Sequence, residues 1–251
     1  MSGNALEVSD LKVWFPVKKG VFARTVEHVK AVDGVSFVLR EGTTLGIVGE
    51  SGSGKSTVAR VISGLVKPTA GSFKVNGKVA MVFQDPLGSL NPRMNVRSTL
   101  EETLRFASGG NGFGFTAAGL MELVGLEASA LEKYPHEFSG GQRQRICIAR
   151  ALAANPSILI CDEAVSALDL SIRSQVLDLL KELKRSFSLS LVFITHDLGV
   201  VNHIADDIIV MHRAKIIEKG PCADVLKAPR EEYTKNLVAS VPKIGRSFIR
   251  R

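Results

Sequence analysis

The chain has 251 residues, 45% of them hydrophobic and 23% charged, and carries a formal net charge of +7. This hydrophobic content suffices for a packed core, and the length suits one α/β domain with an inserted helical subdomain better than two large domains. The sequence has no run of about 18 apolar residues and no basic N-terminal region followed by an apolar stretch. We therefore expect neither a membrane-spanning helix nor a secretory signal.

Cysteines and basic residues narrow the class of protein further. The cysteines form no C-x-x-C motif, and two of them lie in apolar runs, which favours buried thiols in a reducing compartment over a disulfide or metal role. The cysteines are Cys147, Cys161 and Cys222. The basic clusters are Lys18–Lys19, Arg143 with Arg145, and Arg246 with Arg250 and Arg251. No aromatic residues interleave these clusters, which favours a solvated basic surface over nucleic-acid binding.

The N-terminal segment predicts two strands. Ala5–Phe15 alternates enough to form an edge strand, which we expect to end at Pro16. A basic loop or loose hairpin then leads to a second strand, Ala31–Leu39. Trp14 or Phe15 could stack on a purine base, or both could simply pack in the sheet. The local sequence leaves these alternatives open.

A phosphate-binding loop follows. It fits the pattern G-x-x-x-x-G-K-[ST] and consists of Gly49, Glu50, Ser51, Gly52, Ser53, Gly54, Lys55, Ser56 and Thr57. A buried strand, Thr44–Val48, precedes it and a helix, Thr57–Ile62, follows it, which is the context that separates such a loop from a plain Gly/Ser turn. Backbone N–H groups of the loop can surround a phosphate. Lys55 supplies a charge for the terminal phosphates, and Ser56 offers a hydroxyl to Mg²⁺.

Two short strands are expected next, Gly71–Val75 and Val79–Phe83. Asn76 and Gly77 join them and are a typical hairpin turn. The second strand ends at Gln84, where a sheet usually opens onto its ligand crevice. Gln84 could bind Mg²⁺ or orient water, or it could be an ordinary turn residue.

The next block is helical. Helices are predicted for Val96–Phe106, Thr116–Val124 and Ala128–Lys133, after a loop at Leu87–Pro92. A Gly-rich stretch, Ser108–Gly114, separates the first two and is expected to be mobile. Because this block interrupts an α/β pattern, we expect it to form an inserted subdomain.

A second potential anion site follows at a helix start. Ser139 is a good N-cap, and Gln142 stands three residues later, as in a capping box. Gly140 and Gly141 lie between them, so the helix Gln142–Ala153 begins with exposed N–H groups and the positive end of its dipole. This site has no lysine of its own, and a plain capped helix is the alternative.

Two buried strands end in chemically active side chains. Ser157–Cys161 is followed by Asp162 and Glu163, and two carboxylates at the end of a buried strand are costly unless they have a function. Asp162 can hold Mg²⁺ through water, and Glu163, pointing the other way along the pleat, can act as a general base. Leu189–Thr195 ends in His196, which could bond a γ-phosphate.

The remaining elements complete the pattern. They are a turn at Ser166–Asp169, a helix at Ser171–Phe187, closing strands at Asp206–Met211 and Lys215–Glu218, and terminal helices near Val225 and over Tyr233–Val238.

These motifs, in this order, resemble the nucleotide-binding subunit of ABC transporters. The matching set is Gly49–Thr57, Gln84, Ser139–Gln142, Ile158–Glu163, Ser166–Asp169 and His196. The resemblance implies one ABC ATPase domain over 1–251, with a phosphate-loop NTPase core of α/β class. Its sheet would be mainly parallel, with an N-terminal antiparallel β subdomain. The implied division is core at 1–86 and 155–220, helical subdomain at 87–154 and C-terminal helical tail at 221–251.

The resemblance also implies ATP and Mg²⁺ as cofactors and assigns the site residues. Phe15, with Trp14 as the other candidate, would stack on adenine. Residues 49–57 would hold the phosphates, and Ser56, Gln84 and Asp162 would manage Mg²⁺. Glu163 and His196 would act with Lys55 and Gln84 in hydrolysis. Two domains would pair head to tail, so that the partner's ATP is completed by Ser139, Gly140, Gly141, Gln142 and Asp169.

A narrower likeness points to the oligopeptide, dipeptide and nickel importer ATPases. It rests on Phe83–Pro86, Ser89–Arg93, Ala31–Phe37, Tyr233–Lys235 and Val241–Pro242. It implies an importer ATPase, for peptides first and for nickel or another small solute as the alternative. Its partners would be a second ATPase, identical or a related paralogue, and membrane permeases. A substrate-binding protein would act indirectly, and the place would be the cytoplasmic face of the membrane.

Two other classes compete with this interpretation. A soluble ABC ATPase acting on DNA or ribosomes usually has tandem domains or a long coiled-coil insertion, which 251 residues do not hold. A non-hydrolysing module would lack Lys55, Glu163 or His196. Departures from the family are Ala164 in place of Pro, Phe138 in place of Leu and a short 76–81 segment. No cysteine follows Cys222, so no iron–sulfur cluster is expected.

Overall fold

The computed structural model describes residues 3–19, 24–108 and 114–240. The strands are β1 (Asn4–Lys19), β2 (Arg24–Arg40), β3 (Thr44–Val48), β4 (Ala70–Val75), β5 (Val79–Val82), β6 (Ile158–Asp162), β7 (Ser190–Thr195), β8 (Asp207–His212) and β9 (Lys215–Pro221). The α-helices are α1 (Lys55–Ile62), α2 (Pro86–Ser89), α3 (Val96–Ser108), α4 (Ala117–Leu123), α5 (Gly140–Ala153), α6 (Leu170–Ser186), α7 (Leu198–Ile204), α8 (Cys222–Lys227) and α9 (Glu232–Ala239). Two 3-10 helices are η1 (Ala128–Glu132) and η2 (Pro135–Glu137).

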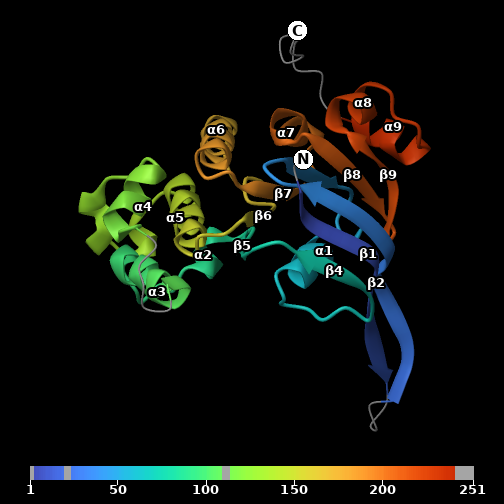
Figure 1. Ribbon diagram of the computed structural model, residues 1–251, viewed down its shortest axis with the longest axis horizontal. Coiled ribbons are helices and arrows are strands. Elements are labelled where there is room, and N and C mark those ends of the chain that lie inside the picture. The colour runs from blue at the N-terminus through green and yellow to red at the C-terminus, as the bar shows by residue number, and fades with distance from the viewer. Residues whose placement is uncertain (1–2, 20–23, 109–113, 241–251) are drawn as a thin grey trace.

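The strands form two sheets. A three-stranded antiparallel sheet has the order β2-β1-β4, and a six-stranded sheet has the order β5-β6-β7-β3-β8-β9. Within the second sheet only the β8–β9 pair is antiparallel. Figure 1 shows helices α3, α4 and α5 at one end of the molecule and the antiparallel sheet at the other. The predicted fold class, a phosphate-loop NTPase core with an antiparallel β subdomain and an inserted helical block, is confirmed.

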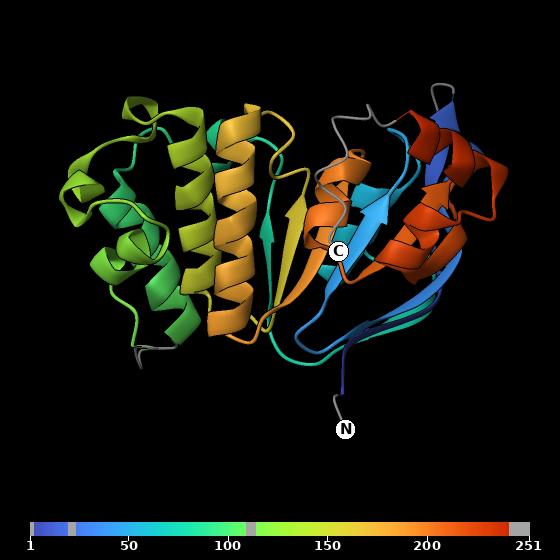
Figure 2. The same cartoon turned by 90° about the horizontal axis from the view of Figure 1, so that it is seen from above.

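The parallel sheet is the centre of the core. Strands β3, β6 and β7 are buried along their whole length, as their apolar runs predict for parallel strands covered on both faces. On one face, side chains such as Ile160 and Ile194 pack against α1 and the antiparallel sheet. On the other, Cys161 and Phe193 pack against α5 and α6. Figure 2 shows α5 and α6 running side by side beside this sheet.

The first strand corrects two expectations. Pro16 does not end β1, which continues to Lys19, and β1 is the central strand of its sheet rather than an edge. Pairing with β4 reaches only Lys12, opposite Ala70, while pairing with β2 continues through Pro16, opposite His28. Beyond Lys12, β1 has a neighbour on one side only, where a residue without an N–H is tolerated.

The predicted hairpin at Asn76-Gly77 is wrong. Strand β4 pairs with β1, whereas β5 pairs in parallel with β6, so the turn carries the chain from one sheet to the other. The Asn76 N–H donates to the Ala5 carbonyl at 2.8 Å, and its side-chain amide donates to Glu41 at 2.9 Å. The apolar strand after the turn extends the buried parallel sheet rather than pairing back on β4.

Several short helices differ from the prediction. The expected loop at 87–92 begins instead as the single turn α2, because the Asp85 carboxylate accepts the Leu87 N–H and Pro86 suits a first helical position. The helix expected at 128–133 is the 3-10 helix η1, and η2 and α7 were not predicted. Most of the Gly-rich stretch and the basic residues Arg246, Arg250 and Arg251 lie outside the described residues. Within the described ranges, no helix has the length and apolar character needed to cross a bilayer.

Candidate nucleotide-binding site

The phosphate loop lies between β3 and α1 and is closed in by neighbouring strands. Gly49 has φ +149° and Gly54, the N-cap of α1, has φ +104°. A Cβ at Gly49 would overlap the Met211 carbonyl at the end of β8, and one at Gly54 would overlap the Ala31 carbonyl of β2. The shape of the loop therefore requires glycine at both positions.

Lys55 is the first residue of α1 and is 4% exposed. Its Nζ donates to the carbonyls of Gly49 and Glu50, at 2.7 Å each. Burial lowers the pKa of Lys55, and the nearby carboxylates of Glu163 and Asp162 oppose that shift. The loop thus holds a buried cation among carbonyls that a phosphate oxygen could replace as its partner.

Asp162 ends β6 and meets Ser56 of α1. The Ser56 hydroxyl donates to Asp162 Oδ1 at 2.9 Å, and Asp162 is 7% exposed. Burial raises the pKa of Asp162, although the hydrogen bond from Ser56 acts the other way. A hydroxyl and a carboxylate, side by side and largely desolvated, form the oxygen donor set that suits Mg²⁺.

The carboxylate of Glu163 is the meeting point of three predicted site residues. Gln84 Nε2 donates to Glu163 Oε2 at 3.1 Å, and His196 Nδ1 lies 3.5 Å from the same oxygen. Glu163 lies just past β6, with φ +50° and its N–H donating to the Ile194 carbonyl at 2.9 Å. A left-handed conformation is strained for a residue with a Cβ and is typical of functional sites. The ends of β5, β6 and β7 therefore bring Gln84, Glu163 and His196 together.

The aromatic alternatives at the end of β1 differ in their surroundings. Trp14 Nε1 donates to Asp33 at 3.2 Å, and Lys30 Nζ lies 4.8 Å from the Trp14 ring centre. Phe15 is paired with Val29 and is 44% exposed. Two side chains thus engage Trp14, and Phe15 is the more exposed of the two candidates.

The start of α5 has the capping box that the sequence predicts. The Gln142 N–H donates to Ser139 Oγ at 3.3 Å, and the Ser139 N–H donates to Gln142 Oε1 at 3.0 Å, which confirms the capping box. A Cβ at Gly141 would overlap the Ile172 side chain of α6, whereas one at Gly140 would make only an ordinary contact with Leu168. Asp169 is the N-cap of α6, and its carbonyl accepts the Arg173 N–H. Helix α5 belongs to the helical block. Strands β5 and β6 lie between it and the antiparallel sheet (Figure 2).

Two side chains make contacts at the site that the sequence did not predict. Tyr233 on α9 accepts the Glu50 N–H through its hydroxyl at 3.0 Å, so the tail of the chain contacts the phosphate loop. Arg173 on α6 donates to Asp197, the neighbour of His196, at 2.9 Å. Both contacts join segments distant in sequence. The segment Tyr233–Lys235 marked a family likeness but not this contact.

These features define a phosphate-loop NTPase: a glycine loop with a buried lysine, a serine–aspartate pair and a glutamate at the carboxyl ends of parallel strands. The family model described as ABC transporter matches residues 32–166. The chain belongs to the ABC transporter family, and membership makes it an ATPase that couples ATP hydrolysis to transport.

Individual relatives sharpen this assignment. The oligopeptide transport ATP-binding protein OppF of Lactococcus lactis is 44% identical, over 95% of this chain and 81% of its own. The dipeptide transport ATP-binding protein DppF of Escherichia coli is 45% identical, over 96% of this chain and 77% of its own. Among solved structures, a dimeric ATP-binding cassette bound to ADP and Pi has a TM-score of 0.73 and 27% identity, covering 86% of this chain and 98% of that one.

Proposed function

We propose that the chain is the ATP-binding and hydrolysing subunit of an importer for dipeptides or oligopeptides. The observation that supports ATP hydrolysis is that the Gln84 amide and the His196 imidazole lie 3.1 and 3.5 Å from the same carboxylate oxygen of Glu163. The observation that favours peptides over nickel is the identity of 44–45% to transport ATP-binding proteins named for oligopeptides and dipeptides.

The phosphate loop and Asp162 would hold the nucleotide and its metal. Loop N–H groups and Lys55 would bind the phosphates, because the loop offers donors and a buried positive charge. Ser56 and Asp162 would hold Mg²⁺, with Gln84 nearby through its free oxygen. When bound, Mg²⁺ neutralises phosphate charge. Phe15 would stack on adenine, because its ring is exposed while that of Trp14 is engaged.

Glu163 would act as the general base. It would accept a proton from the attacking water, whose oxygen bonds to the γ-phosphorus as the bond to the ADP oxygen breaks. Gln84 would orient that water and His196 would bond the γ-phosphate, since both side chains already lie at the carboxylate.

The second anion site would complete a partner's ATP site. The α5 start offers Ser139, Gly140, Gly141 and Gln142 but no lysine, and the nearby Arg143 guanidinium donates to the carbonyls of Pro135 and His136. Its dipole and N–H groups would therefore supplement a phosphate loop rather than substitute for one. Asp169, at the start of α6, would lie at the same junction. A head-to-tail pair, either two copies or this chain with a paralogue, is supported by the dimeric state of the similar solved cassette.

A permease would dock beside Gln84. Phe83 and Leu87 flank it in sequence and are 36% and 50% exposed, so apolar surface for a partner lies beside the catalytic cluster. Docking there would place the chain at the cytoplasmic face of the membrane as a peripheral subunit. A substrate-binding protein would act through the permease, and no nucleic-acid partner is proposed.

Glu163→Gln tests the catalytic role. The variant should keep ATP binding and lose at least about 100-fold in kcat, because the amide cannot accept the proton. It should also accumulate an ATP-dependent closed dimer, measured by size-exclusion chromatography with light scattering. The matched control is Glu122→Gln, an exposed carboxylate on α4, which should leave both quantities unchanged. Unchanged turnover in Glu163→Gln would refute the base role.

The cargo is tested separately. The chain is co-purified with its membrane partners, and ATPase activity is measured with their binding protein and either peptides or Ni²⁺. Stimulation by peptides supports the proposal, and stimulation by Ni²⁺ alone overturns its peptide part.

A further inference from the structure

Arg173 connects two loops that border the catalytic cluster. Its Nη1 donates to Asp197 Oδ2 at 2.9 Å. Its Nη2 donates to the carbonyls of Ser166 and Leu168, at 3.4 and 3.2 Å. The guanidinium therefore holds backbone oxygens of the turn Ser166–Asp169 with one end and the residue after His196 with the other. A planar group with several donors suits such a bridge.

These contacts close a ring around Glu163. The Glu163 carbonyl accepts both the N–H and the Oγ–H of Ser166, at 3.1 and 2.9 Å. Ser166 is bridged by Arg173 to Asp197, the neighbour of His196, and His196 returns to the Glu163 carboxylate at 3.5 Å. The Ser166–Asp169 turn and the loop that carries His196 and Asp197 are thus connected twice. One connection runs through Arg173, and the other runs through Glu163 and His196.

Both ends of the bridge are firmly placed. Asp197 Oδ1 accepts the N–H groups of Gly199 and Val200 at 2.8 and 3.3 Å, so this oxygen caps α7 and leaves Oδ2 for Arg173. Arg173 stands on α6, which is anchored by buried side chains such as Val176 and Leu180. Asp197 is 38% exposed, and an ion pair this open to water contributes little to stability.

We propose that Arg173 is a positioning residue for ATP hydrolysis: it fixes His196 relative to Glu163 and couples both to the Ser166–Asp169 turn. The inference rests on the proposed roles of Glu163 and His196. Because Asp169 in the same turn is proposed to face the partner's nucleotide, Arg173 would transmit the state of that neighbouring site to this chain's own catalytic pair.

The experiment measures steady-state ATP hydrolysis by the full-length chain with its ATPase partner. In Arg173→Ala, kcat should fall about 10- to 100-fold, since small misplacements of catalytic groups are costly. KM for ATP should stay within about 2-fold, because the phosphate loop makes its contacts elsewhere. Arg173→Lys should fall between wild type and alanine, because a point charge can keep Asp197 but not both carbonyls.

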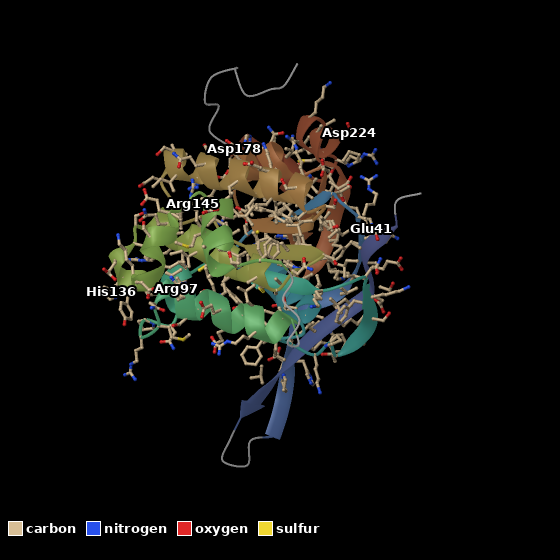
Figure 3. All side chains as sticks on the ribbon, turned by 60° about the vertical axis from the view of Figure 1, so that its left-hand side comes forward. Glu41, Arg97, His136, Arg145, Asp178 and Asp224 are labelled. Atoms are coloured by element: carbon tan, nitrogen blue, oxygen red, sulfur yellow. The ribbon has the colours of Figure 1, made fainter. Side chains whose placement is uncertain are left out.

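Asp197→Asn supplies the coupling test. Its side chain can still cap α7, so it should lower kcat without unfolding the protein. The double variant Arg173→Ala/Asp197→Asn should be no slower than Arg173→Ala alone, because both changes break one connection. The chemically matched control is Arg97→Ala on α3 (Figure 3), which should keep wild-type kcat. Its guanidinium pairs with Glu132 of the helical block, and both side chains are exposed.

Three results would overturn the proposal: wild-type kcat in Arg173→Ala, additive losses in the double variant, or a loss confined to KM. They are distinct from failure of the proposed function, which would appear as full turnover in Glu163→Gln. Thermal unfolding of each variant separates misplacement from misfolding, since Arg173→Ala should unfold within about 3 °C of wild type.

Discussion

The two halves of the proposed ATP site are built in different ways. The phosphate loop lies against the middle of β2, at Ala31, and the end of β8, at Met211, with a buried lysine and two nearby carboxylates. The start of α5 is mostly exposed, is capped by its own side chains and has no lysine and no acidic residue in its first turn. The first half is shaped by packing between distant segments, whereas the second is a local structure that any capped helix can form. A helix start alone attracts a phosphate only weakly, so the second half depends on a partner for its function.

Glycine substitution should show this difference most strongly. Gly54→Ala places a Cβ against the Ala31 carbonyl at a left-handed φ, and should cost about 3 kcal/mol or more. That cost lowers the unfolding midpoint by about 6–12 °C. Gly140→Ala would place its Cβ in ordinary contact with Leu168 on a helical backbone, so its midpoint should change by less than about 2 °C. Equal midpoints, measured by calorimetry, would contradict the contrast between the two halves.

The same contrast explains what the sequence could predict. The phosphate loop, β3 and the Ser139–Gln142 cap follow from local spacing, and each was predicted closely. The Asn76-Gly77 turn was misassigned because its local signal is that of a hairpin, while the partner of β5 lies about 80 residues away in β6. Tyr233 and Glu50 are 183 residues apart, so their contact has no local signature.

Mixed dimers test whether the two halves come from different chains. Ser139→Arg should block the partner's site by bulk and lower hydrolysis there about 100-fold. In one arrangement, one chain carries Ser139→Arg and the other carries Lys55→Ala or the equivalent substitution in the paralogue. Both substitutions then fall in the same ATP site, and the other site stays intact. Placing both in one chain damages two sites. ATPase activity of the two arrangements should therefore differ, and equal activity would contradict head-to-tail pairing.

Asp162→Asn tests the electrostatic cost of the first half. Burial raises the pKa of Asp162 above its ordinary value of 3.8, so ionisation in the folded state costs free energy. The asparagine variant, free of nucleotide, should therefore unfold a few degrees above wild type at neutral pH. This increase in the unfolding midpoint is complete above the folded-state pKa of Asp162, and it vanishes as the pH falls below 3.8, the ordinary pKa of the group. Thermal unfolding between pH 4 and 8 measures it, and a gain that grows on acidification would contradict the assignment. Mg²⁺-dependent hydrolysis should be lost in the same variant.

Tyr233→Phe tests the smallest contribution, that of the tail to the phosphate loop. The variant keeps the ring beside His212 but removes the acceptor of the Glu50 N–H, a loss of about 1 kcal/mol. Helix α9 itself should stay in place, because Glu218 still accepts the N–H groups of Arg230 and Glu231 at its start.

KM for ATP should therefore rise about 2- to 5-fold with kcat unchanged, since a loosened loop binds phosphates less well but leaves Glu163 untouched. Tyr134→Phe, on the helical block, is the matched control and should leave KM at the wild-type value. A KM that Tyr233→Phe does not change would mean that β2 and β8 alone shape the loop. A raised KM would mean that the half-site built by distant packing reaches as far as α9, whereas the capping box at the start of α5 is complete within four residues.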